Sequence, residues 1–233
     1  MKTHLKEKTC TSLIPFYNER ERIGTVLEVL SKVKNLTKII CIDDGSIDNT
    51  SEFINQKYKN VEVIRSEKNQ GKSAAILQAL EKVQSEYVML FDADIHDFQA
   101  SEIEKSLEVV FNDDSVDMLI LRRQNEPFFI KFTRGELVLS GERILSTQDL
   151  LEIYKQKPQS YQLEIAINLF MIEKKRNVFW FPYSGRNTFK SKKVGLVKGM
   201  LKELQMYRNV GSYIGYKKYM ENLLFFCRDE YPH

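Results

Sequence analysis

Apolar runs of strand length alternate with helical patterns over the first half of this chain, and this alternation restricts the fold more than any other feature. The apolar runs are residues 10–14, 38–42, 61–64, 87–91 and 116–121. The helical patterns between them are residues 19–34, 50–58, 72–83 and 101–111. Such alternation predicts a mainly parallel sheet with helices on both faces, joined by right-handed crossovers. We expect the first strand to stop at Pro15.

A polar cluster follows each of the first four predicted strands. The clusters are Pro15-Phe16-Tyr17-Asn18-Glu19, Asp43-Asp44-Gly45-Ser46, Asn69-Gln70-Gly71-Lys72 and Asp92-Ala93-Asp94. In an open α/β sheet the carboxyl ends of the strands meet at one edge, and ligands bind there. We therefore expect the four clusters to gather along one edge of the sheet and to form a binding site.

Two carboxylates, Asp92 and Asp94, stand one residue apart directly after a buried strand. Mg²⁺ and Mn²⁺ prefer such oxygen ligands and often share them with substrate phosphates. The pair therefore predicts a metal–diphosphate site. A solvated acidic turn is the alternative interpretation of these two residues taken alone.

The other clusters carry side chains that suit a nucleotide. Asp43 and Asp44 can accept hydrogen bonds from a nucleobase edge or a ribose hydroxyl, and Tyr17 offers an aromatic face for a base. Lys72 stands after Gly71 at a predicted helix start, where its charge and the helix dipole both favour a phosphate. A plain turn at Asp43-Asp44 and a solvated Lys72 are the alternatives.

Composition is that of an ordinary soluble globular chain, with 233 residues and a net charge of only +3. We expect one domain over residues 1–233. The cysteines form no C-x-x-C pair, which favours free thiols in a reducing compartment. The chain shows neither an apolar signal core nor a membrane-spanning stretch, so we expect it in the cytoplasm.

The second half has a less regular pattern. Residues 161–173 predict an amphipathic helix, and residues 178–182 predict a strand. From Tyr183 to Met220 the chain has nine basic residues and one acid, Glu203. Apolar residues lie among these charges, which is typical of a helix at the inner face of a membrane. Packing of the same apolar residues on the sheet is the alternative, and no nucleic-acid-binding motif accompanies the basic residues.

The four clusters, in their order, resemble the motifs of family 2 glycosyltransferases with the GT-A fold. The resemblance covers roughly residues 9–125, and it implies a nucleotide-sugar-binding half (1–125) and an acceptor-binding half (126–233). It implies a GT-A, Rossmann-like α/β/α sandwich with a mainly parallel central sheet, and a UDP- or GDP-sugar donor. Pro15, Tyr17, Glu19 and Asp44 would line the nucleoside pocket, with Lys72 near it. Asp92 and Asp94 would hold Mn²⁺ or Mg²⁺ on the diphosphate, which makes Asp94 a predicted catalytic residue.

The second half resembles, less closely, the dolichyl-phosphate mannosyltransferase branch of that family. The matching positions are Arg122 or Arg123, Ser140-Gly141-Glu142-Arg143, Tyr161-Gln162-Leu163-Glu164, and Arg186 before Ser191-Lys192. The resemblance implies that Arg122, Arg123, Arg143, Arg186 and Lys192 hold the phosphate of a polyprenyl or dolichyl phosphate acceptor. Arginine suits this role because its fork binds phosphate bidentately.

The resemblance leaves open the roles of two residues, His96 and Glu164. His96 stands where many members have glutamine, and imidazole can ligate Mn²⁺, so His96 is a candidate third metal ligand. A phosphate acceptor is already anionic and needs no general base. A hydroxyl acceptor, soluble or on a glycan, needs one, and Glu164 is the best candidate. The Gln-x-x-Arg-Trp signature of processive polysaccharide synthases is absent.

Three other classes of protein are alternatives. A P-loop NTPase would place its phosphate loop at residues 66–73, but that pattern demands glycine where Ser66 stands. A nucleotidyltransferase would carry a glycine-rich loop with Arg and Lys after the first strand, where this chain has Pro15-Phe16-Tyr17. A non-catalytic binding protein would not need an intact Asp92 and Asp94.

Overall fold

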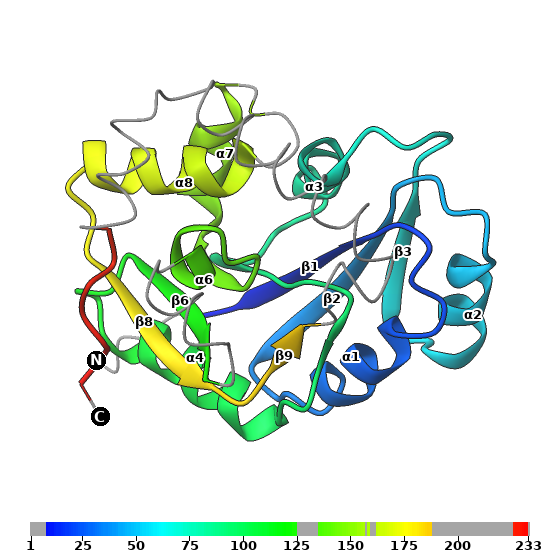
Figure 1. The fold of residues 1–233 in the computed structure, drawn as a ribbon, viewed down its shortest axis with the longest axis horizontal. Coiled ribbons are helices and arrows are strands. Elements are labelled where there is room, and N and C mark those ends of the chain that lie inside the picture. The colour runs from blue at the N-terminus through cyan, green and yellow to red at the C-terminus, as the bar shows by residue number, and fades with distance from the viewer. Residues whose placement is uncertain (1–7, 125–134, 157, 159–161, 188–225, 233) are drawn as a thin grey trace, which may run out of the picture.

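A seven-stranded sheet forms the centre of the protein in the computed structural model, which describes residues 8–124, 135–156, 158, 162–187 and 226–232 (Figure 1). The strands follow the order β3-β2-β1-β4-β7-β6-β8. Their bounds are β1 Cys10–Phe16, β2 Leu36–Asp43, β3 Val61–Arg65, β4 Tyr87–Leu90, β6 Met118–Arg123, β7 Arg143–Ser146 and β8 Val178–Tyr183. A separate two-stranded ribbon pairs β5 (Ile95–His96) with β9 (Arg186–Asn187).

All described strands of the main sheet run in one direction except β7. It is antiparallel to both of its neighbours, β4 and β6, whereas the other adjacent pairs are parallel. Strand β6 therefore runs parallel to β4, and the carboxyl ends of β1 to β4, β6 and β8 share one edge with the start of β7. The predicted mainly parallel α/β/α architecture is confirmed.

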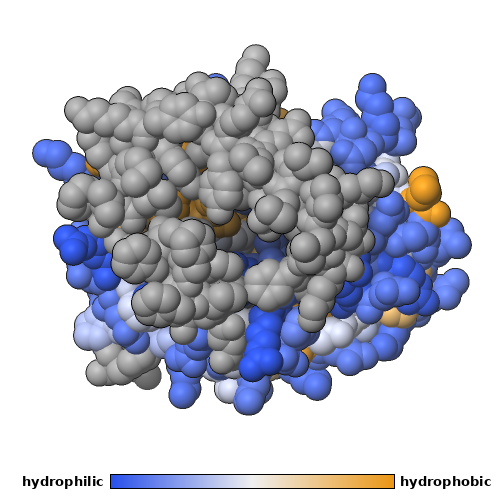
Figure 2. Space-filling view, in the orientation of Figure 1, coloured by the Kyte–Doolittle hydropathy of each residue, from blue (hydrophilic) through white to orange (hydrophobic). Residues whose placement is uncertain are grey.

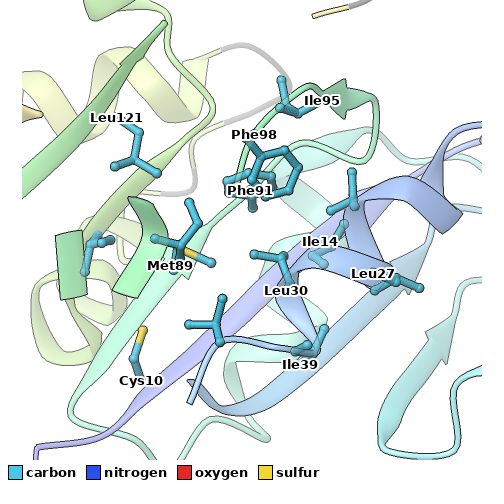
Figure 3. Packing of buried hydrophobic residues seen from close by; sticks show 14 of the residues in the cluster. Cys10, Ile14, Leu27, Leu30, Ile39, Met89, Phe91, Ile95, Phe98 and Leu121 are labelled. Carbon is cyan, nitrogen blue, oxygen red and sulfur yellow. The ribbon is translucent and has the colours of Figure 1, made fainter. Parts of the chain in front are cut away.

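Helices cover both faces of the sheet and close two hydrophobic cores (Figure 1). The helices are α1 Ile23–Leu30, α2 Thr50–Lys57, α3 Lys72–Leu80, α4 Ala100–Asn112, α6 Gly135–Val138, α7 Thr147–Tyr154 and α8 Gln162–Glu173. Side chains of α3, α6, α7 and α8 pack on one face. Those of α1 and α4 pack on the other, where Leu27 and Leu30 meet Ile14 and Met89 (Figure 3). Successive side chains of a strand point to opposite faces of the sheet, so the same strands contribute residues to both cores.

The prediction that the first strand stops at Pro15 is wrong, because β1 continues to Phe16. Both backbone groups of a residue in a parallel strand face the same neighbour, and the Leu13 carbonyl accepts from Phe91 on the β4 side. Pro15, two residues on, faces the same side, beyond the last residue that β4 pairs with β1. Its missing N–H thus falls where the β1–β4 ladder ends, whereas the other side of β1 stays paired with β2 as far as Phe16.

Strand β7 and helix α7 lie where the sequence predicted no regular structure. Strand β7 has only four residues. Its first residue, Arg143, is charged, and so is Glu142 directly before it. Ser146 is the N-cap of helix α7, and its Oγ accepts from the backbone N–H of Asp149. The elements that the sequence predicted within the described residues exist, with ends that differ by a few residues.

A C-terminal segment, residues 226–231, lies along the outer edge of β8. Trp180 donates its backbone N–H to Asp229 (3.1 Å) and accepts from Tyr231 (2.9 Å). The segment buries Phe226 and Cys227, and the thiols of Cys10 and Cys41 are buried as well. This pairing covers what would be an open strand edge.

The described part of the surface is mostly hydrophilic on the face drawn in Figure 2. Among the described residues, no helix has both the length and the apolar character needed to cross a membrane. The basic segment after Asn187, with its predicted interfacial helix, lies outside the described residues.

Replacing Ile76 by alanine should lower the free energy of unfolding by about 2–5 kcal/mol, because this α3 side chain is fully buried. The neighbouring Leu77 is 47% exposed, so Leu77→Ala should change that free energy by less than about 0.5 kcal/mol. Urea unfolding followed by circular dichroism measures both values. Equal losses would contradict this packing of α3.

Candidate functional site

The loops that follow β1 and β2 are bonded to each other at the carboxyl edge of the sheet. The backbone N–H of Asn18 donates to Ser46 Oγ at 2.9 Å, and Asn18 Oδ1 accepts from the backbone N–H of Ile47 at 2.9 Å. Asn18 has a positive φ of 56°, which asparagine tolerates better than most residues. The sequence predicted that these clusters would meet, and the hydrogen bonds confirm it.

Asp44 joins the loop after β2 to the loop after β3. Its Oδ1 accepts from the backbone N–H of Gln70 (2.8 Å), and its Oδ2 accepts from that of Gly71 (2.7 Å). Gly71 has φ +92°, a conformation that favours glycine, and directly precedes α3. Two N–H groups of this loop thus face a carboxylate, which does not suit the phosphate cradle of a P-loop.

Lys72 is shared by two carboxylates from different parts of the chain. Its Nζ lies 2.7 Å from Asp92 Oδ1 and 2.9 Å from Glu164 Oε1. Burial alone would lower the pKa of Lys72, but the charges of Asp92 and Glu164 raise it above its ordinary value. Burial would raise the pKa of Asp92, and Lys72 more than offsets this, so that Asp92 is held ionised. The predicted nucleotide, metal and base residues therefore meet in one cluster.

Glu142 is a buried carboxyl beside this cluster, and sequence reasoning missed it. Its Oε2 lies 2.9 Å from Ser140 Oγ, which donates to it, and 3.9 Å from Arg123 Nη1. Burial raises its pKa to about 7, with the charge of Asp92 adding to the rise and Arg123 opposing it. It stands at the unspecified position of the Ser-Gly-x-Arg pattern, so the motif drew attention to Arg143 instead.

Arg143 does not fit its predicted role as an acceptor-phosphate ligand. It is fully buried at the start of β7, and its guanidinium donates five hydrogen bonds within the protein. The acceptors are the carbonyl oxygens of Ser140, Glu164, Leu137 and Val138, and Asn168 Oδ1. With all five donors engaged, Arg143 joins β7 to α6 and α8 as a structural residue.

Asp43, predicted to bind nucleotide, is also a structural residue. It is fully buried, accepts from the backbone N–H of Ser46 (2.7 Å) and from Ser51 Oγ, and lies 3.6 Å from Arg65 Nε. These partners fix the turn that presents the next residue, Asp44. The predicted nucleotide role of Asp44 stays a prediction.

The loop after β1 places the remaining predicted nucleoside-pocket residues at the same edge. Pro15 is half-buried at the end of β1, and Tyr17 is exposed. The Glu19 carboxylate pairs with Arg22 Nε at the start of α1. The charges of Glu19 and Asp94 raise the pKa of Arg22 against the lowering effect of its burial.

Asp94 and Asp92 supply two carboxylates for a metal in the turn after β4, where both are half-buried. The described residues form no cluster of three His, Cys, Asp or Glu side chains that could hold an ion by themselves. His96 lies instead against Asp97, with 3.1 Å between Nδ1 and Oδ2. A third-ligand role for His96 stays a prediction. Two carboxylates plus substrate phosphates are a common ligand set for Mg²⁺ or Mn²⁺.

The other predicted acceptor residues of the described chain also come to this edge. Arg122 and Arg123 end β6, and the Arg122 guanidinium lies 4.6 Å from the centre of the Trp180 ring. Arg186 on β9 is cross-strand from His96 and lies 3.8 Å from Asp97. Lys192 lies outside the described residues. The structure thus places Arg122, Arg123 and Arg186 near this edge, in separate surroundings, without testing what they bind.

The comparisons with known proteins give one family match and several similar proteins. Residues 11–175 match Glycosyl transferase family 2. An uncharacterised protein of Methanocaldococcus jannaschii is 32% identical over 144 residues, 55% of this chain and 62% of that protein. A poly-beta-1,6-N-acetyl-D-glucosamine synthase of Staphylococcus epidermidis is 38% identical over 97 residues, 39% of this chain. This chain matches 23% of that synthase, so it spans less than two thirds of either relative.

Solved structures share the fold over most of the chain. Glucosyl-3-phosphoglycerate synthase from Mycobacterium tuberculosis, in complex with Mn²⁺, UDP and glucosyl-3-phosphoglycerate, has a TM-score of 0.67 at 18% identity. That match covers 87% of this chain and 77% of the other. At this identity the likeness shows the fold alone, and it agrees with the predicted GT-A architecture.

The stability of the wild type should fall as pH rises from about 4.5 to about 7, relative to that of Glu142→Gln. In this range the native state keeps a proton on Glu142 that the unfolded chain has lost, so rising pH favours unfolding. A rise of this pKa from 4.5 to about 7 corresponds to about 3 kcal/mol. Urea unfolding at several pH values, with EDTA present, measures this pH dependence of the free energy of unfolding. Glu86→Gln, at an exposed position, is the control, and parallel pH profiles for wild type and Glu142→Gln would contradict the assignment.

Replacing Arg143 by methionine should lower the free energy of unfolding by about 3–5 kcal/mol, because buried carbonyl groups lose their donors. Arg186→Met, at a side chain that is 53% exposed, should cost less than about 1 kcal/mol. Chemical unfolding of both variants gives the two values. A stable Arg143→Met protein would show that these hydrogen bonds are dispensable.

Proposed function

This chain belongs to glycosyl transferase family 2, and we propose that it transfers a hexose from a nucleotide-diphosphate sugar to an acceptor, with the help of a divalent metal ion. The observation that carries the proposal is the contact of Lys72 with Asp92 and Glu164 at the edge where the loops of β1, β2 and β3 are bonded together. These charges stand where the fold binds ligands. A nucleotide diphosphate with its metal offers both the positive and the negative groups that such a site can bind.

Asp92 and Asp94 would hold the metal, either Mn²⁺ or Mg²⁺. One buried carboxylate oxygen at this site, Oε2 of Glu164, makes no hydrogen bond with the described residues. A divalent cation suits a site with surplus acceptor oxygens. When bound, the metal would neutralise the charge that develops on the departing diphosphate. The structural relative described above was crystallised with Mn²⁺ and UDP, which supports this part of the proposal.

The nucleoside would lie over the loops after β1 and β2. Tyr17 and Pro15 offer apolar surface to a base, and Asp44 and Glu19 are carboxylates of the kind that accept from a base edge or ribose hydroxyls. The hydrogen bonds of Asn18 and Asp44 fix these loops before any ligand arrives. Preorganisation of this kind lowers the ordering cost of binding.

Lys72 would keep Asp92 ionised and meet the negative diphosphate. Its charge is held in place by two carboxylates, so little reorganisation is needed when the donor binds. We expect this residue to act through positioning and charge, not as a proton donor, because its pKa is raised further above neutrality.

The acceptor is proposed to carry a phosphate, as a polyprenyl or dolichyl phosphate at a membrane surface does. Arg123 and Arg122 at the end of β6, with Arg186 on β9, supply guanidinium groups that suit phosphate. A phosphate oxygen is anionic near neutral pH, so the attack on the sugar requires positioning and no base. Peripheral association with the inner face of the cytoplasmic membrane belongs to the same proposal.

A hydroxyl acceptor, soluble or on a glycan, is the second candidate, and Glu164 favours it. This residue is 6% exposed, one of its oxygens is bound to Lys72, and the other is unpaired among the described residues. That oxygen could accept the proton of an attacking hydroxyl. The relative from M. tuberculosis is named for a phosphorylated soluble product, glucosyl-3-phosphoglycerate.

A screen of UDP- and GDP-sugars with and without Mn²⁺ or Mg²⁺ tests the donor site. A donor at 100 times its Kd should raise the melting temperature by about 5–10 °C. Asp94→Asn should abolish the metal-dependent part of this rise in melting temperature. Asp97 is an exposed neighbour, and Asp97→Asn should retain that part of the rise. A shift with ATP and Mg²⁺ but with no sugar nucleotide would overturn the proposal.

Transfer assays then separate the acceptors. Vesicles that contain polyprenyl phosphate should yield a glycolipid if the acceptor is a lipid phosphate. Product with a soluble phosphorylated hydroxy acid alone would instead support the hydroxyl acceptor and the base role of Glu164, which Glu164→Gln would then remove.

A further inference from the structure

Gly141 lies directly opposite Asp92 on the neighbouring strand. In the β4–β7 pair, Leu90 stands opposite Arg143, and each antiparallel step advances one residue on each strand. Two steps beyond that pair, the register brings Asp92 against Gly141. The two residues thus meet at the edge of the sheet, just past the last ladder pair.

The Asp92 carboxylate occupies the place that a side chain at position 141 would take. A Cβ built on Gly141 would lie 2.5 Å from both carboxylate oxygens of Asp92 and 2.6 Å from its Cγ. These are its three nearest atoms. No real Cβ tolerates such distances, so any other residue at position 141 would push the carboxylate away.

Packing, and not backbone conformation, requires glycine at this position. The glycines with positive φ in the described chain are Gly45 and Gly71, and Gly141 is not among them. An alanine could adopt the backbone of Gly141 without strain, but it has no room for its methyl group. The absence of a side chain at position 141 therefore lets the backbone lie directly against the Asp92 carboxylate.

The turn that carries Gly141 is held on both sides and cannot give way easily. Arg143 Nε donates to the Ser140 carbonyl at 2.7 Å, and Leu121 donates its backbone N–H to the Glu142 carbonyl at 3.0 Å. On its other side the Asp92 carboxylate is bound by Lys72 at 2.7 Å. The carboxylate therefore lies between an ammonium group and a rigid glycine surface.

We propose that Gly141 is a positioning residue that fixes the orientation of the Asp92 carboxylate for the metal–diphosphate group. This inference rests on the proposed function and deepens it. It also gives the Ser140-Gly141-Glu142-Arg143 turn a new role, because the turn supports the donor site instead of binding the acceptor. Loss of groups that orient a metal ligand typically weakens metal affinity by about 10–100-fold.

A double-mutant cycle tests the contact without any ligand. Gly141→Ala should lower the melting temperature clearly in the wild-type background and much less in the Asp92→Ala background, where the conflicting atoms are gone. Gly24→Ala is the matched control, because its nearest contact, at 3.4 Å to the Phe53 ring, is ordinary packing. If Gly141→Ala fails to fold, recovery of the fold in the double variant supports the contact. Equal losses in both backgrounds would overturn it.

Calorimetry of UDP binding tests the consequence for the site. Gly141→Ala should weaken Mn²⁺-dependent binding of UDP by about 10–100-fold and leave binding of UDP without metal unchanged. Mn²⁺-dependent binding equal to that of the wild type would overturn the positioning role. If the wild type itself shows no metal-dependent binding, the proposed function fails, and the stability cycle still decides whether Gly141 makes room for Asp92.

Discussion

One ammonium group shared by two carboxylates joins the two halves of this protein at its candidate site. Lys72 begins α3, Asp92 follows β4, and Glu164 lies on α8, so the cluster depends on the packing of all three elements. Removing such charges from water is unfavourable, and their attraction offsets that penalty only in part. The cluster is therefore poor evidence of stability and better evidence of function. Asp94 follows Asp92 by two residues, so a second carboxylate stands in the same turn after β4.

Local patterns were enough to predict the architecture of the first half of the chain, residues 1–125. Strands β1 to β4 and the helices between them have apolar spacing that reports their burial, and parallel topology then forces their following loops to one edge. Tyr17, Asp44, Lys72, Asp92 and Asp94 could thus be grouped without knowledge of distances. Only the predicted end of β1 was wrong, because a proline is tolerated in a strand where pairing with the neighbour on that side has ended.

The rest depended on contacts that no local pattern reports. Strand β7 is four residues long and antiparallel among parallel neighbours, and its charged first residue gave no sign of burial. Arg143 is inside because carbonyl groups from α6 and α8 surround it, and these are distant in sequence. Asp43 and Asp44 are identical in type and adjacent, yet only the fold decides that one supports the turn and the other joins two loops.

The fit between Asp92 and Gly141 also bears on how the sheet finds its pairing during folding. A slip of β7 by one residue would turn its buried side chains to the opposite face of the sheet. It would also set Ser140 or Glu142 against Asp92, and each of these carries a side chain where only a glycine leaves room. Of the three adjacent residues, just one is compatible with the aspartate opposite. The same close approach that shapes the site therefore discriminates against misregistered strands, so that a correctly paired sheet and a correctly placed carboxylate arise together.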